Sequence, residues 1–293
     1  MRLRSVTATL FALALCLALL FQSCSGSFQT TTDPTTDKMA QEHVGDTPVA
    51  SAASQMEPAI PITAMSVDYA TVDGQTVTGY LAQPEAMPQP LPAIIAIHEW
   101  WGLNENIEAM ARRLAGEGYT VLAVDLYSGQ TAEAPDQARQ LMQAVMQDPE
   151  PAQRNLEQAY TFLTEEYDAP TVGSIGWCFG GGWSLRTGLL LPQQLNALAI
   201  YYGQLVTDKA ELEPLSMPII GFFGEDDQAI PVSDVRAFET ALNDLNKNAE
   251  IYIFPGVGHA FANPSGQNYS PEAAAAAWIE TTDFFEETLK GAA

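Results

Sequence analysis

The chain has 293 residues, of which 47% are hydrophobic and 16% are charged, which is enough for a sizeable core. Thirty-six acidic residues against 12 basic ones give a formal net charge of −24. This balance excludes a protein that holds nucleic acid through phosphate contacts, because such contacts need Lys and Arg. The excess of acid fits either simple solubility or adaptation to a salty environment.

The first 24 residues have the features of an export signal. Arg2 and Arg4 precede the apolar run "LFALALCLALLF", which is too short to span a bilayer comfortably. The run leads into "QSCSG", where Cys24 resembles the lipidated cysteine of bacterial lipoproteins, with ordinary signal cleavage as the alternative. We therefore expect residues 1–24 to be a signal peptide with Cys24 lipidated. The protein would be exported to the periplasm or cell envelope and anchored at the outer membrane.

Residues 25–60 differ in composition from the rest of the chain. Thr, Ser, Asp, Pro and Gln dominate, and large apolar residues are sparse and without a period. Such a composition predicts a disordered tether between the anchor and a folded body. His43 lies in this segment and is expected to be solvated.

After residue 60, strand-like and helix-like segments alternate. Asp73-Gly74 is a good hairpin turn between two strands, and the later strands read as continuous apolar runs. We expect strands at 65–71, 76–82, 92–99, 119–127, 171–176, 195–203, 217–227 and 249–256, and helices at 106–118, 135–146, 152–166, 183–191, 232–246 and 271–290. Repeated strand–helix units predict one α/β domain, 61–293. Its sheet would be doubly wound and mostly parallel, with an antiparallel edge and helices on both faces.

The stretch "SIGWCFGGGW" places a cysteine among glycines directly after a predicted strand. Gly176-x-Cys178-x-Gly180 is the nucleophile-elbow pattern with Cys in place of Ser, and glycines leave room for the sharp strand-to-helix turn. The alternative is a buried structural cysteine packed beside glycines. Because Cys16 leaves with the signal and Cys24 would be acylated, the elbow cysteine has no disulfide partner within the exported chain.

Two further residues follow the elbow in the order that elbow hydrolases use, nucleophile, acid and then histidine. Asp227 lies 49 residues after Cys178, and His259 follows 32 residues later in the glycine-rich "GVGHAF". Of the three histidines only His259 comes after the elbow. Asp226 or Asp227 could instead cap the helix that follows.

The motifs "HEWWGLN", "DLY", "GWCFGG", "GEDDQAIP" and "PGVGHAF" together resemble the dienelactone hydrolase family of α/β-hydrolases, over about residues 60–290. The resemblance implies the α/β-hydrolase fold and a catalytic triad of Cys178, His259 and Asp227. It also implies a role for Glu99. In the family, the carboxylate at this position keeps the resting thiol neutral and takes its proton when substrate arrives.

The resemblance also implies the surroundings of the triad. The backbone N–H groups of Phe179 and Trp100 are the expected oxyanion donors. Four residues are candidates for substrate binding: Tyr127, Arg139, Trp101 and Asn263. Family members that act on dienelactone hold its carboxylate with arginines, and Asn263 stands where one of them would be. The acyl chemistry is therefore better supported than the named lactone.

The sequence favours a cysteine-dependent hydrolase of lactones or small carboxylic esters that works through a thioester acyl-enzyme. The alternatives are a general carboxylesterase or thioesterase with the same triad, and an inactive hydrolase fold that binds a ligand. We expect no cofactor and no metal, because zinc needs clustered His or Cys and the mature chain shows no such cluster. The expected partners are a small lactone or ester substrate, no nucleic acid, and a membrane only through the lipid anchor. We expect a monomer.

Overall fold

The computed structural model describes residues 34–51 and 56–291, all within one compact unit that begins at Pro34. Cys24 and the predicted signal peptide lie outside the described residues, so lipidation stays a prediction. The strands are β1 (Ile62–Val72), β2 (Gln75–Pro84), β3 (Ala93–Ile97), β4 (Thr120–Val124), β5 (Val172–Trp177), β6 (Ala197–Tyr201), β7 (Ile219–Gly224) and β8 (Ala249–Phe254). The helices are α1 (Pro34–Glu42), α2 (Glu105–Gly116), α3 (Pro135–Gln147), α4 (Glu150–Glu165), α5 (Phe179–Leu190), α6 (Lys209–Leu212), α7 (Val232–Asp244) and α8 (Pro271–Phe285), which continues as the π-helical turn η1 (Glu286–Lys290).

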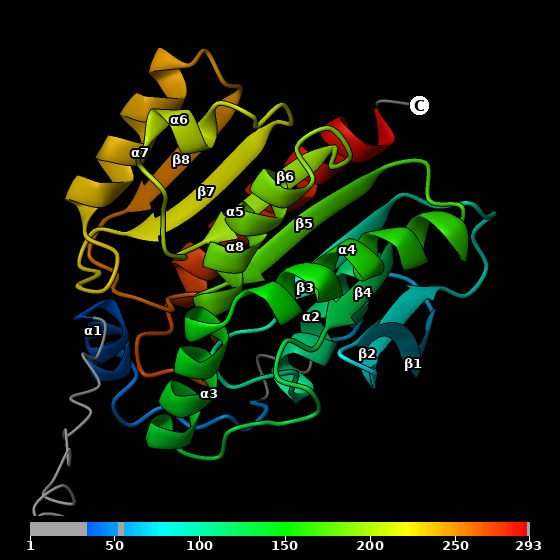
Figure 1. Ribbon diagram of the computed structural model, residues 1–293, viewed down its shortest axis with the longest axis horizontal. Coiled ribbons are helices and arrows are strands. Elements are labelled where there is room, and N and C mark those ends of the chain that lie inside the picture. The colour runs from blue at the N-terminus through cyan, green and yellow to red at the C-terminus, as the bar shows by residue number, and fades with distance from the viewer. Residues whose placement is uncertain (1–33, 52–55, 292–293) are drawn as a thin grey trace, which may run out of the picture. The chain divides into compact units, whose positions relative to one another are not determined.

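The strands form one sheet in the order β1-β2-β4-β3-β5-β6-β7-β8. β1 and β2 pair antiparallel, β2 is antiparallel to β4, and all later neighbours are parallel. Figure 1 shows α4 and α5 in front of the sheet and α8 behind it. Every residue of β3 to β7 is buried, as continuous apolar runs between two helical layers require. The predicted α/β-hydrolase architecture is confirmed.

The hairpin at the sheet edge also follows the sequence. Asp73 and Gly74 have φ of 49° and 77°, the left-handed conformation at two consecutive positions that a type I′ turn needs. The turn places β1 and β2 side by side as the antiparallel edge, so the parallel strands carry the loops that build the site.

Helix α5 begins at Phe179, four residues before the predicted start at Trp183. The first turn contains three consecutive glycines, which are weak helix formers, and the helical period alone therefore missed it. These glycines permit close packing: a Cβ on Gly180 would lie 2.2 Å from the carbonyl oxygen of Ile97 in β3. Tight contact with the sheet, and not helix propensity, determines where this helix begins.

The described part of the predicted tether is ordered against the domain. Pro34–Glu42 forms α1, and His43, which follows it, is 0% exposed. The expectation of a solvated His43 was wrong. The polar composition concealed Met39, which is 3% exposed and joins the hydrophobic core.

No helix within residues 34–51 and 56–291 is both long and apolar enough to cross a bilayer.

Candidate active site

Cys178 lies at the turn between β5 and α5 in a strained backbone conformation. Its φ of 56° and ψ of −117° are unfavourable for any residue with a side chain. The turn is fixed by a hydrogen bond from Cys178 N to the carbonyl oxygen of Tyr201, at 3.0 Å. It also needs Gly176, because a Cβ there would lie 2.0 Å from the Gly180 carbonyl oxygen. This is the geometry of a nucleophile elbow.

His259 and Asp227 form a buried pair from the loops after β8 and β7. His259 Nδ1 lies 2.7 Å from Asp227 Oδ2, and both side chains are 0% exposed. The other carboxylate oxygen accepts hydrogen bonds from the backbone N–H groups of Ala229 and Ile230, each at 2.8 Å. Asp227 therefore both orders its loop and orients the histidine, whereas Asp226 is exposed. Among the described residues, His259 Nε2 has no hydrogen-bond partner.

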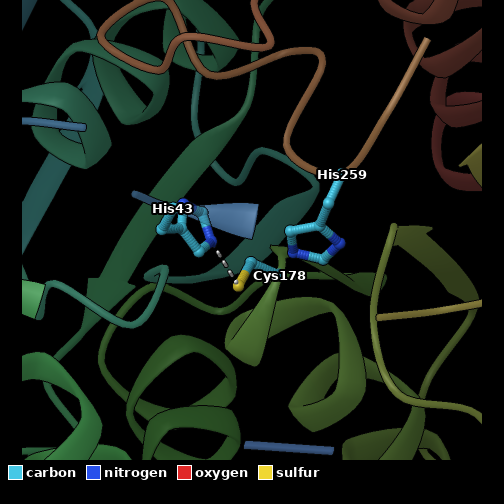
Figure 2. A group of neighbouring side chains, drawn as sticks. All are labelled: His43, Cys178 and His259. Carbon is cyan, nitrogen blue, oxygen red and sulfur yellow. Dashed lines mark hydrogen bonds between the residues drawn. The ribbon is translucent and has the colours of Figure 1, made fainter. Parts of the chain in front are cut away.

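A second histidine approaches the same thiol from the other side. His43 Nε2 lies 3.5 Å from Cys178 Sγ, and its Nδ1 lies 2.7 Å from Asp46 Oδ2. Figure 2 shows the His43 and His259 rings on either side of the sulfur. One ligand atom from each of these three residues lies within 4.8 Å of the other two. The expectation that no cluster of His and Cys exists was therefore wrong, because its members are distant in sequence.

Aromatic and thioether groups complete the packing around His43. Its ring stacks on Trp100 with centroids 4.5 Å apart, and it meets Trp101 edge-on at 6.4 Å. Met39 Sδ lies 3.3 Å from Cys178 Sγ. The thiol is thus covered by residues of the predicted tether.

Residues 37–49, which we call the N-terminal strap, are held by polar contacts to loops around the thiol. The strap shares the region below β7 and β8 in Figure 1 with the loop that follows β8. Its partners outside the strap include Arg139 for Asp37 at 3.3 Å, the Gln228 N–H for Glu42 at 3.0 Å, the Gln267 N–H for Asp46 at 2.7 Å, and Ser265 for the Val49 carbonyl.

The strap leaves little room beside the nucleophile. Cys178 is 0% exposed. The hollow next to Glu99, which Trp177 and Tyr202 also line, has a volume of about 20 Å³. That volume holds about one water molecule, whereas substrate pockets are on the order of 300–1,000 Å³. Strap residues occupy the space from which a substrate would approach the thiol.

Glu99 is buried after β3 and is held by a predicted substrate contact. Its Oε2 accepts a hydrogen bond from Asn263 Nδ2 at 2.8 Å, and its Oε1 has no partner among the described residues. Burial first, and then the nearby Cys178, raise the pKa of Glu99 to about 8. The carboxyl group is therefore mostly protonated at neutral pH. Asn263 positions it, since the Asn263 side chain is used for this bond and for capping Ser265 N.

The two histidines favour the ionised form of the thiol. Burial alone would raise the pKa of Cys178, but the positive charge of His259, and then the charge and hydrogen bond of His43, outweigh it and lower the pKa to about 6. Burial would likewise lower the pKa of His43, but its bonds to Asp46 and Cys178 raise it to about 9. Burial opposes the same change in His259, whose pKa is raised by Asp227 and Cys178. A thiolate between imidazolium rings is a competent nucleophile.

Two backbone N–H groups remain available for an oxyanion. Phe179 is the first residue of α5, so its N–H has no intrahelical acceptor. Trp100 lies in the turn after β3, and its N–H donates no hydrogen bond within the described residues. Both predicted donors therefore have unused donor capacity within the described residues, and their role as oxyanion donors stays a prediction.

The remaining predicted residues lie at different depths. Tyr127 is buried against Phe179 and His98. His98 accepts a hydrogen bond from Leu126 N at 3.1 Å and so shapes its loop. Trp101 is buried and packs on the strap. Arg139 is half-buried and pairs with Asp37 of the strap.

Sequence reasoning missed Met39, His43 and Asp46. The available signal was weak: a histidine three residues before an aspartate, in a segment whose average composition is polar. Averages over a segment conceal the few residues that dock.

Comparisons with known proteins agree with this fold. The family model described as "Dienelactone hydrolase family" matches residues 77–289 of this chain. A relative from Synechocystis, described as "Putative carboxymethylenebutenolidase", is 32% identical over 231 residues, covering 73% of this chain and 93% of the relative. A relative of the same description from Aquifex aeolicus is 30% identical over 225 residues, covering 74% of this chain and 96% of the relative. The solved structure of the "Putative Dienelactone Hydrolase" of Klebsiella pneumoniae has a TM-score of 0.70 and 27% identity, covering 78% of this chain and 99% of that one.

Fold, elbow and matched residues together define a hydrolase of the α/β class that acts on esters or lactones. The chain belongs to the dienelactone hydrolase family. The N-terminal strap lies outside the matched residues 77–289.

Proposed function

We propose that this chain hydrolyses lactones or small carboxylic esters through a thioester on Cys178. The observation that carries the proposal is the left-handed elbow thiol within 4.8 Å of a histidine that a buried aspartate orients. A nucleophile, a base and a group that orients the base are the three parts of a hydrolytic triad.

In the first half of the reaction, the Cys178 thiolate attacks the carbonyl carbon of the substrate and forms a carbon–sulfur bond. The carbonyl π electrons move to oxygen, and the N–H groups of Phe179 and Trp100 stabilise the oxyanion. When the tetrahedral intermediate collapses, the alkoxide leaves and takes a proton from the His259 imidazolium. In a lactone the released hydroxyl stays attached to the acyl group.

In the second half, His259 removes a proton from water while that water attacks the thioester carbonyl. Collapse of the second intermediate releases the carboxylic acid and restores the thiolate. Asp227 keeps the imidazole oriented and stabilises its charged form throughout. Glu99 is protonated and Cys178 is ionised at rest, the reverse of what the family resemblance implies, so a transfer of the thiol proton to Glu99 stays a prediction.

The substrate class rests on relatives and on the missing anchors. Relatives bear the description "Putative carboxymethylenebutenolidase", which supports a lactone. Asn263 binds Glu99 and Arg139 binds Asp37, so neither residue is a free cationic anchor for a substrate carboxylate. Simple esters and thioesters therefore remain substrates to test beside dienelactone, and an inactive ligand-binding fold is the alternative from another class.

Substrate access requires movement of the N-terminal strap. Met39 and His43 contact the sulfur that must attack. The strap contacts of Asp37, Glu42 and Val49 are polar and exposed, and such contacts are individually worth about 0.5–1.5 kcal/mol. We infer that the strap opens to admit the substrate and that the described conformation is the closed one.

We also propose that the protein is exported and anchored by a lipid on Cys24, and that it acts as a monomer. The basic and apolar N-terminal sequence supports export. The proposal would be tested by labelling cells with a palmitate analogue, which should mark the wild type and not Cys24→Ser.

The test of the proposed function is steady-state hydrolysis of p-nitrophenyl acetate, a p-nitrophenyl thioester and cis-dienelactone by the full chain. Cys178→Ala should abolish turnover, by about 10⁴-fold or more, and mass spectrometry of a rapidly quenched reaction should find an acyl adduct on Cys178. Phe179→Leu, which changes a side chain at the elbow and keeps the backbone N–H, is the matched control and should retain the adduct.

The three substrates separate the alternatives. Turnover of dienelactone would assign the lactone, and turnover of the simple ester or thioester alone would assign a broader esterase. Equal rates for wild type and Cys178→Ala on all three would refute the cysteine mechanism and favour a ligand-binding fold.

A further inference from the structure

We propose that Cys178, His259 and His43 form a binding site for a zinc-class transition-metal ion, which joins the N-terminal strap to the catalytic residues. The inference goes beyond the proposed hydrolase function, and its direct readout is metal binding, which needs no turnover.

The donor atoms have the spacing that zinc requires. Zinc–sulfur bonds of about 2.3 Å and zinc–nitrogen bonds of about 2.0 Å at tetrahedral angles place sulfur and nitrogen about 3.5 Å apart. His43 Nε2 and Cys178 Sγ are 3.5 Å apart. All three ligand atoms lie within 4.8 Å of one another, so inward shifts of about 1 Å complete the triangle. Figure 2 shows the two rings converging on the sulfur from separate parts of the chain.

Each of the two histidines already has a carboxylate within hydrogen-bond distance of its Nδ1. His43 Nδ1 lies 2.7 Å from the Asp46 carboxylate, and His259 Nδ1 lies 2.7 Å from the Asp227 carboxylate. In metal sites such a carboxylate fixes the ring and leaves the other nitrogen to the metal. Here the other nitrogens face the thiol, and His259 Nε2 has no partner within the described part of the chain. A buried polar atom without a partner is costly, and a metal ion would satisfy it.

Charge favours a cation at this position. When a metal ion displaces the protons of the two imidazoliums, the rings become neutral. The thiolate and the carboxylates of Asp46 and Asp227 then supply three negative charges around a divalent ion. Met39 Sδ is 3.3 Å from the sulfur, but thioethers select soft ions such as Cu⁺ and not Zn²⁺. The fourth position of zinc is therefore left to water, and the site has the Cys-His₂ composition of a three-residue centre.

Bound zinc would have two effects. It would occupy the nucleophile and the base, and so prevent attack on a substrate. It would also connect His43 of the strap to two residues of the domain, and so hold the strap closed. Cys178 and His259 alone could bind zinc weakly without the strap. Whether zinc affinity depends on His43 therefore distinguishes the three-residue site from a two-residue one.

The experiment measures the affinity of the reduced, metal-free full chain for Zn²⁺ by chelator competition, and the absorbance of its Co²⁺ complex. We expect one ion per chain and a thiolate-to-Co²⁺ charge-transfer band that Cys178→Ala removes. His43→Phe keeps an aromatic ring against Trp100 and cannot ligate. It should weaken Zn²⁺ binding by about 100-fold or more, and Asp46→Asn by about 10- to 100-fold.

Met39→Leu is the matched control, because it changes another buried strap residue beside the sulfur while preserving its apolar volume. It should bind Zn²⁺ within about threefold of the wild type. Equal affinities in wild type and His43→Phe would overturn the site. Equal losses in His43→Phe and Met39→Leu would do so as well, since they would report strap docking and not ligation. If the wild type binds zinc but hydrolyses none of the three test substrates, only the hydrolase proposal is contradicted.

Discussion

The Cys178 thiol lies between two histidine–aspartate pairs that have the same local geometry. One pair stands on loops of the central sheet, and the other stands on the N-terminal strap. In both pairs His Nδ1 lies 2.7 Å from an aspartate Oδ2, and both histidines are 0% exposed. His259 and Asp227 stand on loops at the ends of adjacent strands β8 and β7. His43 and Asp46 are three residues apart in a turn after α1, on a segment that the family match does not include.

The difference shows that the geometry of a pair does not by itself assign a catalytic role. The sheet holds His259 and Asp227, which are 32 positions apart in the sequence, on the loops after two adjacent strands. His43 reaches the thiol only because the strap docks, and docking can be reversed. We therefore assign turnover to the first pair and control of access to the second.

The sharpest test of this assignment exchanges each histidine for alanine. His259→Ala should lower kcat/KM for an activated ester by roughly 10⁴- to 10⁶-fold, because the base is lost. His43→Ala should raise kcat/KM by about tenfold, since loss of about 1.4 kcal/mol of strap contacts increases the open fraction in proportion. Steady-state rates in the presence of a metal chelator check both. A fall of 100-fold or more in His43→Ala would mean that the second pair is catalytic.

A smaller contrast is expected from the aspartates. Asp227→Asn should lower kcat by roughly 10³- to 10⁴-fold, less than removal of the histidine, because the base stays while its orientation is lost. Asp46→Asn should raise kcat/KM by about two- to fivefold, as one hydrogen bond of the strap weakens. Thermal unfolding of both variants serves as the control for folding. Equal losses of activity in the two variants would erase the distinction between the pairs.

Local sequence patterns predicted the sheet and singled out His259, and the resemblance to the family favoured Asp227 over Asp226 as its partner. Apolar runs, the Asp73-Gly74 turn and the elbow glycines are short-range signals, and the parallel sheet brings loop residues after β3, β5, β7 and β8 to one edge. The order of Cys178, Asp227 and His259 along the chain then indicated the triad.

The second pair could not be read from the sequence in the same way. His43 contacts Cys178 across 135 positions, and Asp46 contacts Gln267 across 221. A polar segment orders only if such distant contacts offset its conformational entropy, and composition does not report them. Likewise, the early start of α5 depends on glycine packing against β3, a tertiary effect that overrides helix propensity.

Glu99 offers a test through pH, because it shares the burial of both pairs and its carboxyl group is hydrogen-bonded, among the described residues, only to the uncharged amide of Asn263. Its pKa is about 8 in the folded protein against about 4.3 in an unfolded chain. Between these values the folded state holds one more proton, so stability present at lower pH is lost as pH rises through this window. The slope is at most about 1.4 kcal/mol per pH unit.

The unfolding free energy of the wild type should fall between pH 5 and pH 8 as Glu99 ionises. In Glu99→Gln this fall should be smaller by roughly 2–4 kcal/mol. Urea unfolding at both pH values, with the exposed Glu225→Gln as the control, measures the difference. Parallel profiles for wild type and Glu99→Gln would mean that the buried carboxyl group ionises as freely as an exposed one.

The smallest effect is expected at the outer end of the strap, where Asp37 pairs with Arg139 at 3.3 Å. These side chains are 43% and 34% exposed, and pairs of this kind contribute about 0.2–1 kcal/mol. Asp37→Asn should therefore raise kcat/KM by about two- to threefold at low salt, and high salt should remove the difference. Asp136→Asn, which removes a second carboxylate 3.5 Å from the same guanidinium and outside the strap, is the control.

Arg139→Ala completes the test. If the arginine only holds the strap, its loss raises kcat/KM as Asp37→Asn does. If it also binds an anionic substrate once the strap is open, its loss lowers kcat/KM for that substrate alone, and a neutral ester measured beside it separates the two roles.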